Sequence, residues 1–349
     1  MNKAAHRLLV WLSCAICAAA ASTTTITARA QEPGTGFHER PAGEPAMGAS
    51  GRTSSAPRCQ VVPRATLPLK EAQGHFVTSL SINSHALPMV VDTGSARTTV
   101  ATYLEDTLGL EPNYRRRWVT VSGVAGDSQP QQGMTAQTVL FGPSHLLNYN
   151  LTLADIARPG DEAAEGMPAG QIGADLLSVY DVEFDFEKHE MTLYSVSGCS
   201  DDFVPWPGPH QRFQAMRTRQ NTLLIPIGLN RRPMLAMIDT GATITTLSRK
   251  AALAAGVDPA VLDQQKFGSL RGMGGMRVAM HLHRFDAVEV GSEGFRNAPI
   301  WVQDGELQDV DMLLGLDFLR PRKLWMAYGT NQVFIQARKQ AEAANTATR

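Results

Sequence analysis

The chain has 349 residues, of which 32 are Lys or Arg and 33 are Asp or Glu, and its formal net charge at pH 7 is −1. This balance excludes the clear excess of positive charge that nucleic acid or an anionic membrane surface attracts, so we expect no nucleic-acid partner. Four cysteines are present, and two of them lie within the first 30 residues.

Residues 1–30 have the pattern of a secretory signal peptide. Lys3 and Arg7 precede an apolar run over residues 8–21, and Ala28-Arg29-Ala30 fits the small-x-small rule for cleavage. We expect cleavage after Ala30, a periplasmic or secreted protein, and no stable membrane anchor. The alternative is an uncleaved anchor, although the apolar run is too short to cross a bilayer comfortably.

The segment that follows, residues 31–58, is rich in Gly, Pro, Ala and Ser and has no apolar periodicity. It predicts a flexible lead, with a removable pro-segment as the alternative. Beyond it only Cys59 and Cys199 remain, an even pair in an oxidising compartment. We expect a disulfide between them, and two unpaired thiols are the alternative.

The rest of the chain reads as mostly strands in two similar lobes. Residues 76–82 and 223–227 alternate as strands do, and 183–194 and 324–336 each predict a terminal hairpin. Helical pattern is confined to short segments such as 101–108 and 248–255. The expected organisation is an N-terminal lobe at 59–199, an inter-lobe linker at 200–217, a C-terminal lobe at 218–338 and a flexible tail at 339–349.

An internal repeat relates the two lobes. Asp92-Thr93-Gly94 and Asp239-Thr240-Gly241 are followed in the same frame by matching Thr-Thr pairs, at 98–99 and 245–246. A second signature closes each copy, Ile-Gly-Ala-Asp at 172–175 and Leu-Gly-Leu-Asp at 314–317. Two copies in a shared frame indicate a duplication, over about 64–197 and 218–338.

The repeated motif supports acid–base chemistry. Three apolar residues precede Asp92 and three precede Asp239, so each carboxylate lies where a buried strand breaks into a turn. If the lobes pack around a pseudo-two-fold axis, the two carboxylates meet and cannot both ionise, so they share one proton. One then acts as acid and the other as base toward a bound water, and no metal or other cofactor is needed.

These motifs resemble those of aspartic proteases of the pepsin and retropepsin superfamily, most closely bacterial secreted retropepsin-like proteins. The resemblance implies an all-β, bilobal acid-protease fold, two homologous retropepsin-like β-barrel lobes related by a pseudo-two-fold axis. It also implies that Asp92 and Asp239 are the catalytic pair, and that Thr93 and Thr240 lock the lobes together. The remaining active-site support is assigned to Gly94, Ser95, Gly241, Ala242, Gly173 and Gly315.

By the same resemblance, the two Gly-rich tips would be flaps over the substrate. Neither tip has the tyrosine of the pepsin flap, which favours retropepsin-like binding through backbone groups. The flap and substrate-binding residues assigned in this way are Ser122, Gly123, Val124, Ala125, Gly126, Gly272, Met273, Gly274 and Gly275.

The two motifs differ at the next position, with Ser95 in one and Ala242 in the other. A serine hydroxyl there can donate to the carboxylate, so we expect Asp92 to be the charged member. By contrast, Asp175 and Asp317 are expected to be helix N-terminal caps rather than catalysts. His281 and His283 lie two apart on a presumed strand with no third ligand at a supporting spacing, so no metal site is expected.

The leading hypothesis is a single-chain aspartic endopeptidase that binds an extended peptide by strand addition between the lobes. Since both aspartates lie in one chain, a monomer suffices. A catalytically inactive two-lobed peptide-binding module of the same fold is the alternative. A third arrangement, in which two chains pair lobe to lobe, keeps the enzyme but changes its assembly.

Overall fold

The computed structural model describes residues 58–115, 118–122, 128–155, 167–265, 267–271, 277–307 and 309–336. The expected signal peptide, nearly all of the lead and nearly all of the tail lie outside these residues. Among the described helices, none is both long and apolar enough to cross a membrane.

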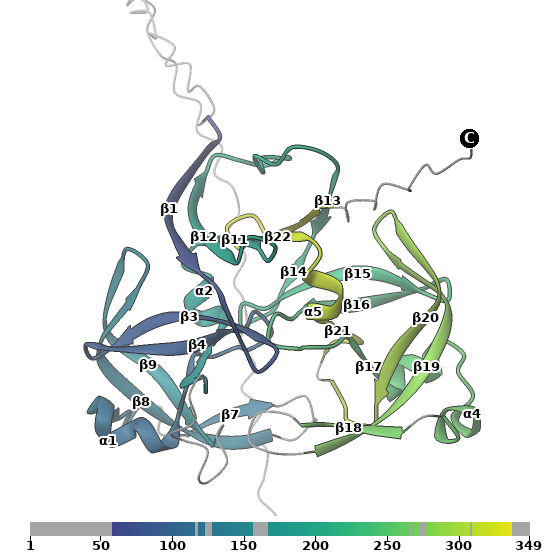
Figure 1. The fold of residues 1–349 in the computed structure, drawn as a ribbon, viewed down its shortest axis with the longest axis horizontal. Helices are drawn as coiled ribbons and strands as arrows, with labels where there is room; N and C mark the ends of the chain where they lie inside the picture. The colour runs from purple at the N-terminus through teal and green to yellow at the C-terminus, as the bar shows by residue number, and fades with distance from the viewer. Residues whose placement is uncertain are drawn as a thin grey trace, which may run out of the picture. The chain divides into compact units, whose positions relative to one another are not determined.

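The N-terminal lobe is a closed six-stranded barrel (Figure 1). Hydrogen bonds follow the order β3, β4, β10, β5, β9 and β8, and the pairing of β8 with β3 closes the ring, with Ser81 opposite Leu140. The strands are β3 His75–Ile82, β4 His85–Val91, β5 Thr99–Ala101, β8 Ser128–Phe141, β9 Ser144–Ala154 and β10 Gly170–Ile172.

The C-terminal lobe repeats this barrel strand for strand. The order is β15, β16, β21, β17, β20 and β19, and β19 closes onto β15, with Gly228 opposite Glu289. The strands are β15 Leu223–Leu229, β16 Arg232–Ile238, β17 Thr246–Ser248, β19 Arg277–Val290, β20 Glu293–Gln303 and β21 Met312–Leu314. The expected pair of homologous β-barrel lobes is therefore confirmed.

Shorter strands and helices decorate the barrels. The strands are β2 Lys70–Ala72, β6 Glu111–Pro112, β7 Trp118–Ser122, β14 Met216–Arg217 and β18 Phe267–Arg271. The helices are η1 Thr102–Leu104, α1 Glu105–Leu108, α2 Ala174–Leu177, α3 Arg249–Ala254, α4 Pro259–Asp263 and α5 Leu316–Leu319. Ser248 caps α3, because its side chain accepts a hydrogen bond from the Ala251 amide at 3.1 Å.

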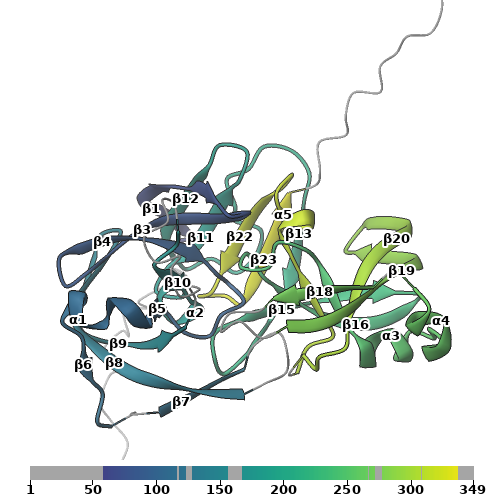
Figure 2. The same cartoon turned by 60° about the horizontal axis from the view of Figure 1, so that its bottom comes forward.

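A third sheet of six strands joins the lobes, in the order β1, β12, β11, β22, β23 and β13 (Figure 2). Its strands are β1 Gln60–Pro68, β11 Asp181–Asp185, β12 Glu190–Ser197, β13 His210–Gln214, β22 Lys323–Ala327 and β23 Gln332–Gln336. The two terminal hairpins meet where β11 pairs with β22, and β13 comes from the segment expected as the linker. Cys59 and Cys199 are joined by a disulfide at the free ends of β1 and β12.

Apolar side chains fill the two barrels and the space beneath the joining sheet. Phe76, Leu80 and Phe141 are buried in the first barrel, and Ile225 and Phe285 in the second. Burial of this kind is the main favourable term in folding, which explains why both barrels keep the alternating apolar pattern of their strands.

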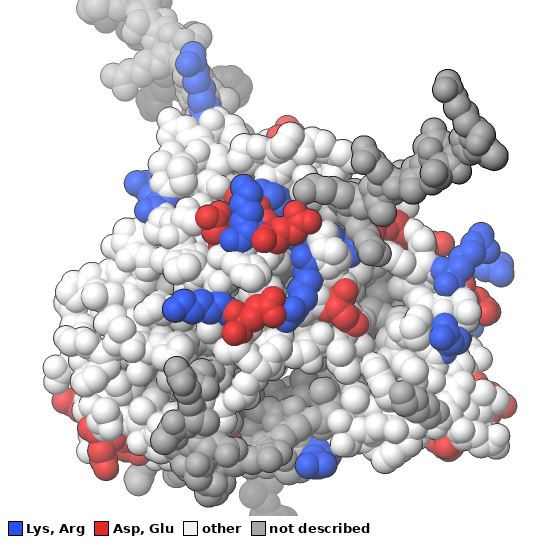
Figure 3. All heavy atoms as spheres, in the orientation of Figure 1, with Lys and Arg blue, Asp and Glu red and all other residues white. Residues whose placement is uncertain are grey.

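Charged side chains on the face in Figure 3 are mixed in sign, with Lys and Arg beside Asp and Glu. The ion pairs around the joining sheet include Lys323 with Asp185 at 2.8 Å and Arg322 with Glu293 at 2.6 Å. This face therefore offers no extended patch of one sign.

Candidate active site

Both Asp-Thr-Gly motifs stand at the end of a barrel strand whose last residue before the motif is buried. Asp92 follows β4 and Asp239 follows β16, and each strand is paired in parallel with the strand before the second signature. The Asp92 amide donates to the Ile172 carbonyl at 3.0 Å, and the Asp239 amide donates to the Leu314 carbonyl at 3.1 Å. The same local structure therefore presents one carboxylate from each lobe.

The carboxyl groups of Asp92 and Asp239 meet at the inter-lobe boundary, because each lies against the glycine of the opposite motif. At this separation the charge of Asp239 raises the pKa of Asp92, so the two groups do not readily ionise together. The two aspartates expected as a pair are therefore brought together within one chain.

Backbone amides orient the two carboxyl groups in the same way. Oδ1 of Asp92 accepts from the amides of Gly94 and Ser95 at 3.0 and 2.9 Å. Oδ1 of Asp239 accepts from the amides of Gly241 and Ala242 at 2.9 and 3.0 Å. No amide of the described residues donates to Oδ2 of either group, so in both aspartates Oδ1 is the inner oxygen, bonded to the loop, and Oδ2 is the outer one.

Burial raises the pKa of both aspartates. For Asp92 the nearby Asp239 carboxylate adds to this effect and holds the pKa well above its usual range, against the lowering effect of the two amides. For Asp239 the amides of Gly241 and Ala242 offset part of the burial effect, and its pKa remains raised. The two groups titrate as a pair that retains one proton above the usual range for a carboxylic acid.

The expectation that Ser95 keeps Asp92 charged is wrong. The Ser95 hydroxyl donates to the Arg97 carbonyl at 3.0 Å and accepts from the Gln171 side-chain amide at 2.5 Å. Its proton is therefore directed away from Asp92, so only the Ser95 amide contacts that carboxylate. The serine stabilises the shape of the active-site loop rather than the charge of its aspartate.

Each glycine of the motif lies against the aspartate of the other lobe. A Cβ atom at Gly94 would lie 2.5 Å from Cγ of Asp239, and a Cβ atom at Gly241 would overlap the Asp92 carboxyl group. These two positions must lack a side chain for the carboxyl groups to meet.

Gly241→Ala should therefore damage both stability and catalysis. We expect the free energy of unfolding to fall by about 1–3 kcal/mol from overpacking, and peptide hydrolysis to fall by roughly 100-fold because the Asp92 carboxyl group is displaced. Gly294→Ala is the matched control, since no atom lies within 4 Å of its added Cβ. Equal effects of the two substitutions in denaturant titrations and rate assays would contradict this close approach.

Thr93 and Thr240 connect the lobes through four hydrogen bonds. Each hydroxyl donates at 2.7 Å to a carbonyl of the other lobe, Thr93 to Ile238 and Thr240 to Val91. Each hydroxyl also accepts from the amide of the opposite threonine at 3.1 Å. Both threonines are buried, so these bonds are shielded from water.

The second signature supports the active-site loop from behind. A Cβ atom at Gly173 would overlap the backbone of Arg97, and one at Gly315 would lie 2.6 Å from the Ile244 carbonyl carbon. These glycines therefore let the signature pack directly on the loop that carries the aspartate.

The expectation that Asp175 and Asp317 are N-terminal caps is wrong as to position, although each accepts the amide of the next helical residue, Leu176 and Phe318, both at 2.9 Å. Gly173 and Gly315 occupy the N-cap positions of α2 and α5, and neither helix has a side-chain cap. Asp175 instead accepts from the amide and hydroxyl of Thr98, both at 2.8 Å. Asp317 accepts in the same way from Thr245, at 2.9 and 2.6 Å. Both aspartates tie the second signature to the active-site loop.

The assigned flap residues lie almost entirely outside the described part of the chain. Ser122 ends β7, which pairs with β8 up to Ser128, whereas Gly123, Val124, Ala125 and Gly126 are not described. In the other lobe β18 pairs with β19 up to Arg271 and Arg277. The arms of both hairpins are therefore present, and the tips at 272–275 remain a prediction.

His75 is a residue near the site that the sequence analysis missed. It begins β3 in the N-terminal lobe and lies against the backbone of Gly241 in the other lobe. Burial, and then the positive charge of Arg320, lower the pKa of His75. Arg320 also donates to the Gly74 carbonyl at 2.7 Å, so this turn connects the two lobes. A histidine outside the repeated motif offered no signal of this contact.

His281 and His283 do not converge on a common ligand site. Nε2 of His281 lies 3.4 Å from Oδ2 of Asp304, and Nδ1 of His283 lies 2.9 Å from Oε1 of Gln265. Across the described residues, no three His, Cys, Asp or Glu side chains are grouped so as to hold a metal ion.

Comparison with known families agrees with this geometry. The profile of the gag-polyprotein putative aspartyl protease family matches residues 78–163 and 225–321, one segment in each lobe, and each segment includes an Asp-Thr-Gly motif. The chain belongs to this aspartyl protease family. The two matched segments correspond to the two repeats of the chain, so both copies of the motif fit the sequence pattern of the family.

Other comparisons are more distant. No curated protein matches the sequence significantly. Among solved structures, the chain is similar to the aspartic proteinase from Irpex lacteus, with 13% sequence identity and a TM-score of 0.47. That match covers 80% of this chain and 98% of the other.

Proposed function

We propose that this aspartyl protease homologue is an active aspartic endopeptidase whose catalytic pair is Asp92 and Asp239. The observation that carries the proposal is the close approach of these two carboxyl groups at the boundary of the lobes, where each lies against the glycine of the opposite motif. It supports one protonated and one ionised carboxyl group side by side, which is the arrangement needed for combined acid and base catalysis.

In the proposed reaction, the ionised carboxylate removes a proton from a water molecule held between the two groups. The water oxygen forms a bond to the peptide carbonyl carbon while the protonated carboxyl group donates to the carbonyl oxygen. The C–N bond then breaks, the group that gained the proton from water gives it to the leaving amine, and a hydroxyl of the tetrahedral intermediate returns its proton to the other carboxylate as the C=O bond forms again. The products are one carboxylic acid and one amine, and the dyad again holds a single proton.

The backbone hydrogen bonds to Oδ1 leave the other oxygen of each carboxyl group for the proposed reaction. Since the amides of Gly94 and Ser95 occupy the inner oxygen of Asp92, its outer oxygen is the one left for water and substrate. The Thr93 and Thr240 bonds keep the two loops at a constant separation. Such positioning lowers the barrier because the reacting groups need little rearrangement.

A protein or peptide substrate would bind in extended form between the lobes. Strand addition to the β7–β8 and β18–β19 hairpins would supply backbone hydrogen bonds, with specificity from alternate side chains. One chain carries the whole dyad, which supports a monomer. The Cys59–Cys199 disulfide supports the expectation of a periplasmic or secreted protein, because thiols stay reduced in most cytosols.

The proposal is tested by digesting a diverse peptide library with residues 31–349 from pH 3 to 8 and identifying the cut sites by mass spectrometry. We expect a bell-shaped dependence of kcat/KM on pH with its maximum at about pH 4–6.5, because one carboxyl group must be ionised and the other protonated. A chain that cuts no peptide at any pH, before and after removal of residues 31–58, would contradict the proposal in favour of a peptide-binding module.

A further inference from the structure

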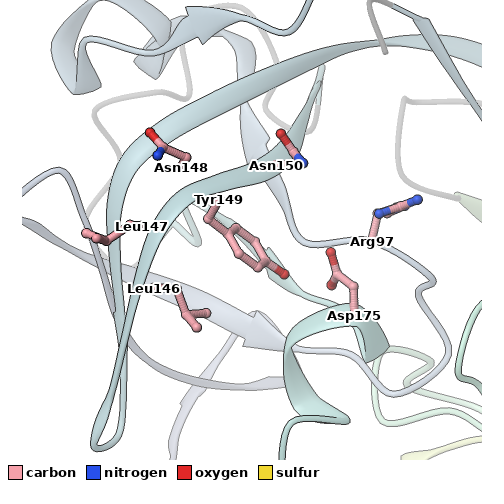
Figure 4. Close-up of a pocket in the computed structure, with 7 residues that line it drawn as sticks. All are labelled: Arg97, Leu146, Leu147, Asn148, Tyr149, Asn150 and Asp175. Atoms are coloured by element: carbon pink, nitrogen blue, oxygen red, sulfur yellow. The ribbon is translucent and has the colours of Figure 1, made fainter. Parts of the chain in front are cut away.

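An open pocket of about 260 Å³ lies on the N-terminal lobe beside the loop that carries Asp92 (Figure 4). Arg97 of that loop, Asp175 of the second signature and part of β9 line it. The β9 side chains in the wall include Leu146, Leu147 and Tyr149. The pocket is distinct from the dyad, since neither Asp92 nor Asp239 lines it.

The Arg97 guanidinium is available to a ligand. Its main chain holds the loop together by accepting from the Ser95 hydroxyl at 3.0 Å, but no described residue forms an ion pair or hydrogen bond with the guanidinium. Arginine presents a planar fork of donors that matches a carboxylate in a bidentate arrangement. The guanidinium lies close enough to Asp175 to lower the pKa of that carboxyl group, and its donors, which bond no described residue, favour a carboxylate-bearing ligand.

The floor of the pocket contains polar atoms whose bonding is incomplete. The hydroxyl of Tyr149 and Oδ2 of Asp175 are both buried and lack a hydrogen bond of normal geometry within the described chain. Figure 4 shows the two groups pointing toward each other, with Arg97 beside Asp175. Buried polar atoms usually have a partner, and these two groups interact with each other, so a polar group that enters the pocket would meet both a hydroxyl and a carboxyl oxygen.

Asp175 does not oppose an anionic ligand as strongly as an exposed carboxylate would. Its Oδ1 already accepts two bonds from Thr98. Burial raises the pKa of Asp175, which disfavours its charged form, and burial followed by the neighbouring Asp175 raises the pKa of Tyr149. Arg97 is the cationic group at the pocket's rim, and its charge offsets part of the effect of burial on the pKa of Asp175.

The repeat in the C-terminal lobe shows that the fold does not require these side chains. Asp317 bonds to Thr245 as Asp175 bonds to Thr98, but Ile244 stands in the place of Arg97 and Ala298 in the place of Tyr149. Both hairpins bend at the same residue, Asn148 and Asn297, with φ of 50° and 51°, which fixes the correspondence. One lobe therefore carries a cation and a hydroxyl where the other has apolar groups.

The pocket is close to the dyad along the chain, which limits how far a bound peptide would have to extend to enter it. Arg97 lies five positions after Asp92, so their Cα atoms are at most about 18 Å apart. An extended substrate spans that distance in about five residues. Leu147, whose side chain is 65% exposed, and Leu146 offer an apolar wall beside the charge, which suits a peptide better than a small inorganic anion.

We propose that this pocket binds an acidic side chain, Asp or Glu, of a peptide substrate at a position up to about five residues from the cut bond, with Arg97 as the specificity-determining residue. The proposal rests on the proposed endopeptidase function.

The test compares peptides that carry Glu or Gln at each of the five positions on either side of a known cut site. At one position we expect kcat/KM to be about tenfold higher for Glu, and the ratio to fall to about one in Arg97→Ile, the residue present in the other lobe. Arg97→Lys should retain part of the preference, because it keeps the charge without the planar fork. Arg296→Ile, which removes an exposed charge from the C-terminal lobe, should leave the ratio unchanged. A Glu-to-Gln ratio near one at all ten positions, or a preference that survives in Arg97→Ile, would overturn the proposal.

A binding measurement separates failure of this proposal from failure of the proposed function. In the Asp239→Asn variant, fluorescence anisotropy of a labelled Glu peptide should show tighter binding than the Gln peptide, and Arg97→Ile should abolish the difference. If the wild-type chain cuts nothing but this difference is present, the pocket stands and the catalytic proposal fails. If peptides are cut and no difference appears in either assay, the pocket proposal fails alone.

Discussion

Substitution of either Asp92 or Asp239 by Asn is expected to abolish peptide hydrolysis and to make the folded protein more stable at neutral pH. Removing the acid–base pair should lower kcat/KM by roughly 10²–10⁴-fold or more. The fold should persist, because an amide oxygen can still accept the backbone bonds that each Oδ1 now accepts. Loss of activity would then be a chemical effect and not one of unfolding.

The gain in stability follows from the raised pKa of each group. Both aspartates have a pKa above the ordinary value of 3.8 in the folded chain. Folding therefore takes up protons. The stability that these groups contribute is fully present below the ordinary pKa of an aspartate and is lost as pH rises through the raised pKa. An Asn variant has no such loss. Its melting temperature should exceed that of the wild type at pH 7 and approach it near pH 3.

Thermal unfolding at pH 7 and pH 3 tests whether the Asn variant is more stable than the wild type only at neutral pH. Asp258→Asn is the control, because Asp258 is an exposed helix cap that accepts from the Ala260 amide at 2.8 Å, and Asn caps equally well. It should not share the pH-dependent stabilisation. A dyad variant that is less stable than the wild type at pH 7, or equally shifted at both pH values, would contradict the shared proton.

Thr93→Ala is expected to cause the largest loss of stability among single substitutions away from the barrel cores. It leaves the Ile238 carbonyl and the Thr240 amide buried without a partner. Each unsatisfied group costs about 1–3 kcal/mol, so the free energy of unfolding should fall by about 2–6 kcal/mol. Activity should fall as well, because the loops that carry the two aspartates would lose their connection.

Denaturant titration of three variants would check this result. Thr93→Ser keeps the hydroxyl and should recover most of the lost stability. Thr66→Ala removes an exposed hydroxyl that lies 3.1 Å from the Thr192 hydroxyl, and should change stability by no more than about 0.5 kcal/mol. If Thr93→Ala were as mild as Thr66→Ala, the bonds between the lobes would not contribute as the geometry indicates.

The features that could be predicted from the sequence are those that occur in both copies of the internal repeat. Apolar strands entering Asp-Thr-Gly at residues 92 and 239 predicted both barrels and the pairing of the two carboxyl groups. The hydroxyls of Thr93 and Thr240 could be assigned to the other lobe because each motif has a partner in the same frame. Because the motif is duplicated, each copy identified the residue of the other copy with which it interacts.

Features that depend on distant pairing could not be predicted in this way. The strand β1 contains Pro63 and Pro68, which argue against a strand, yet it forms the edge of the joining sheet with a register shift beside Pro63. The strand β13 buries only Phe213 and pairs with β23 at the end of the chain. Neither segment has a local pattern that identifies its partner.

The wrong expectations for the Ser95 and Asp175 side chains have a similar cause. Ser95 could reach either its own aspartate or the loop beyond it, and the turn directs it to the Arg97 carbonyl. Asp175 stands at the start of a helix of four residues, but Thr98 offers two donors that a cap would leave unpaired. In both cases the short polar side chain follows the nearest donor or acceptor in space.

We propose that Asp92 and Asp239, one from each lobe of the same chain, form a single catalytic dyad. The most direct test measures kcat/KM on a cleaved library peptide at about pH 5 for the wild type, Asp92→Asn, Asp239→Asn and an equimolar mixture of the two variants. We predict cleavage by the wild type alone. Cleavage by either single variant would contradict the shared dyad, and activity restored by mixing the two would show that the dyad forms between chains.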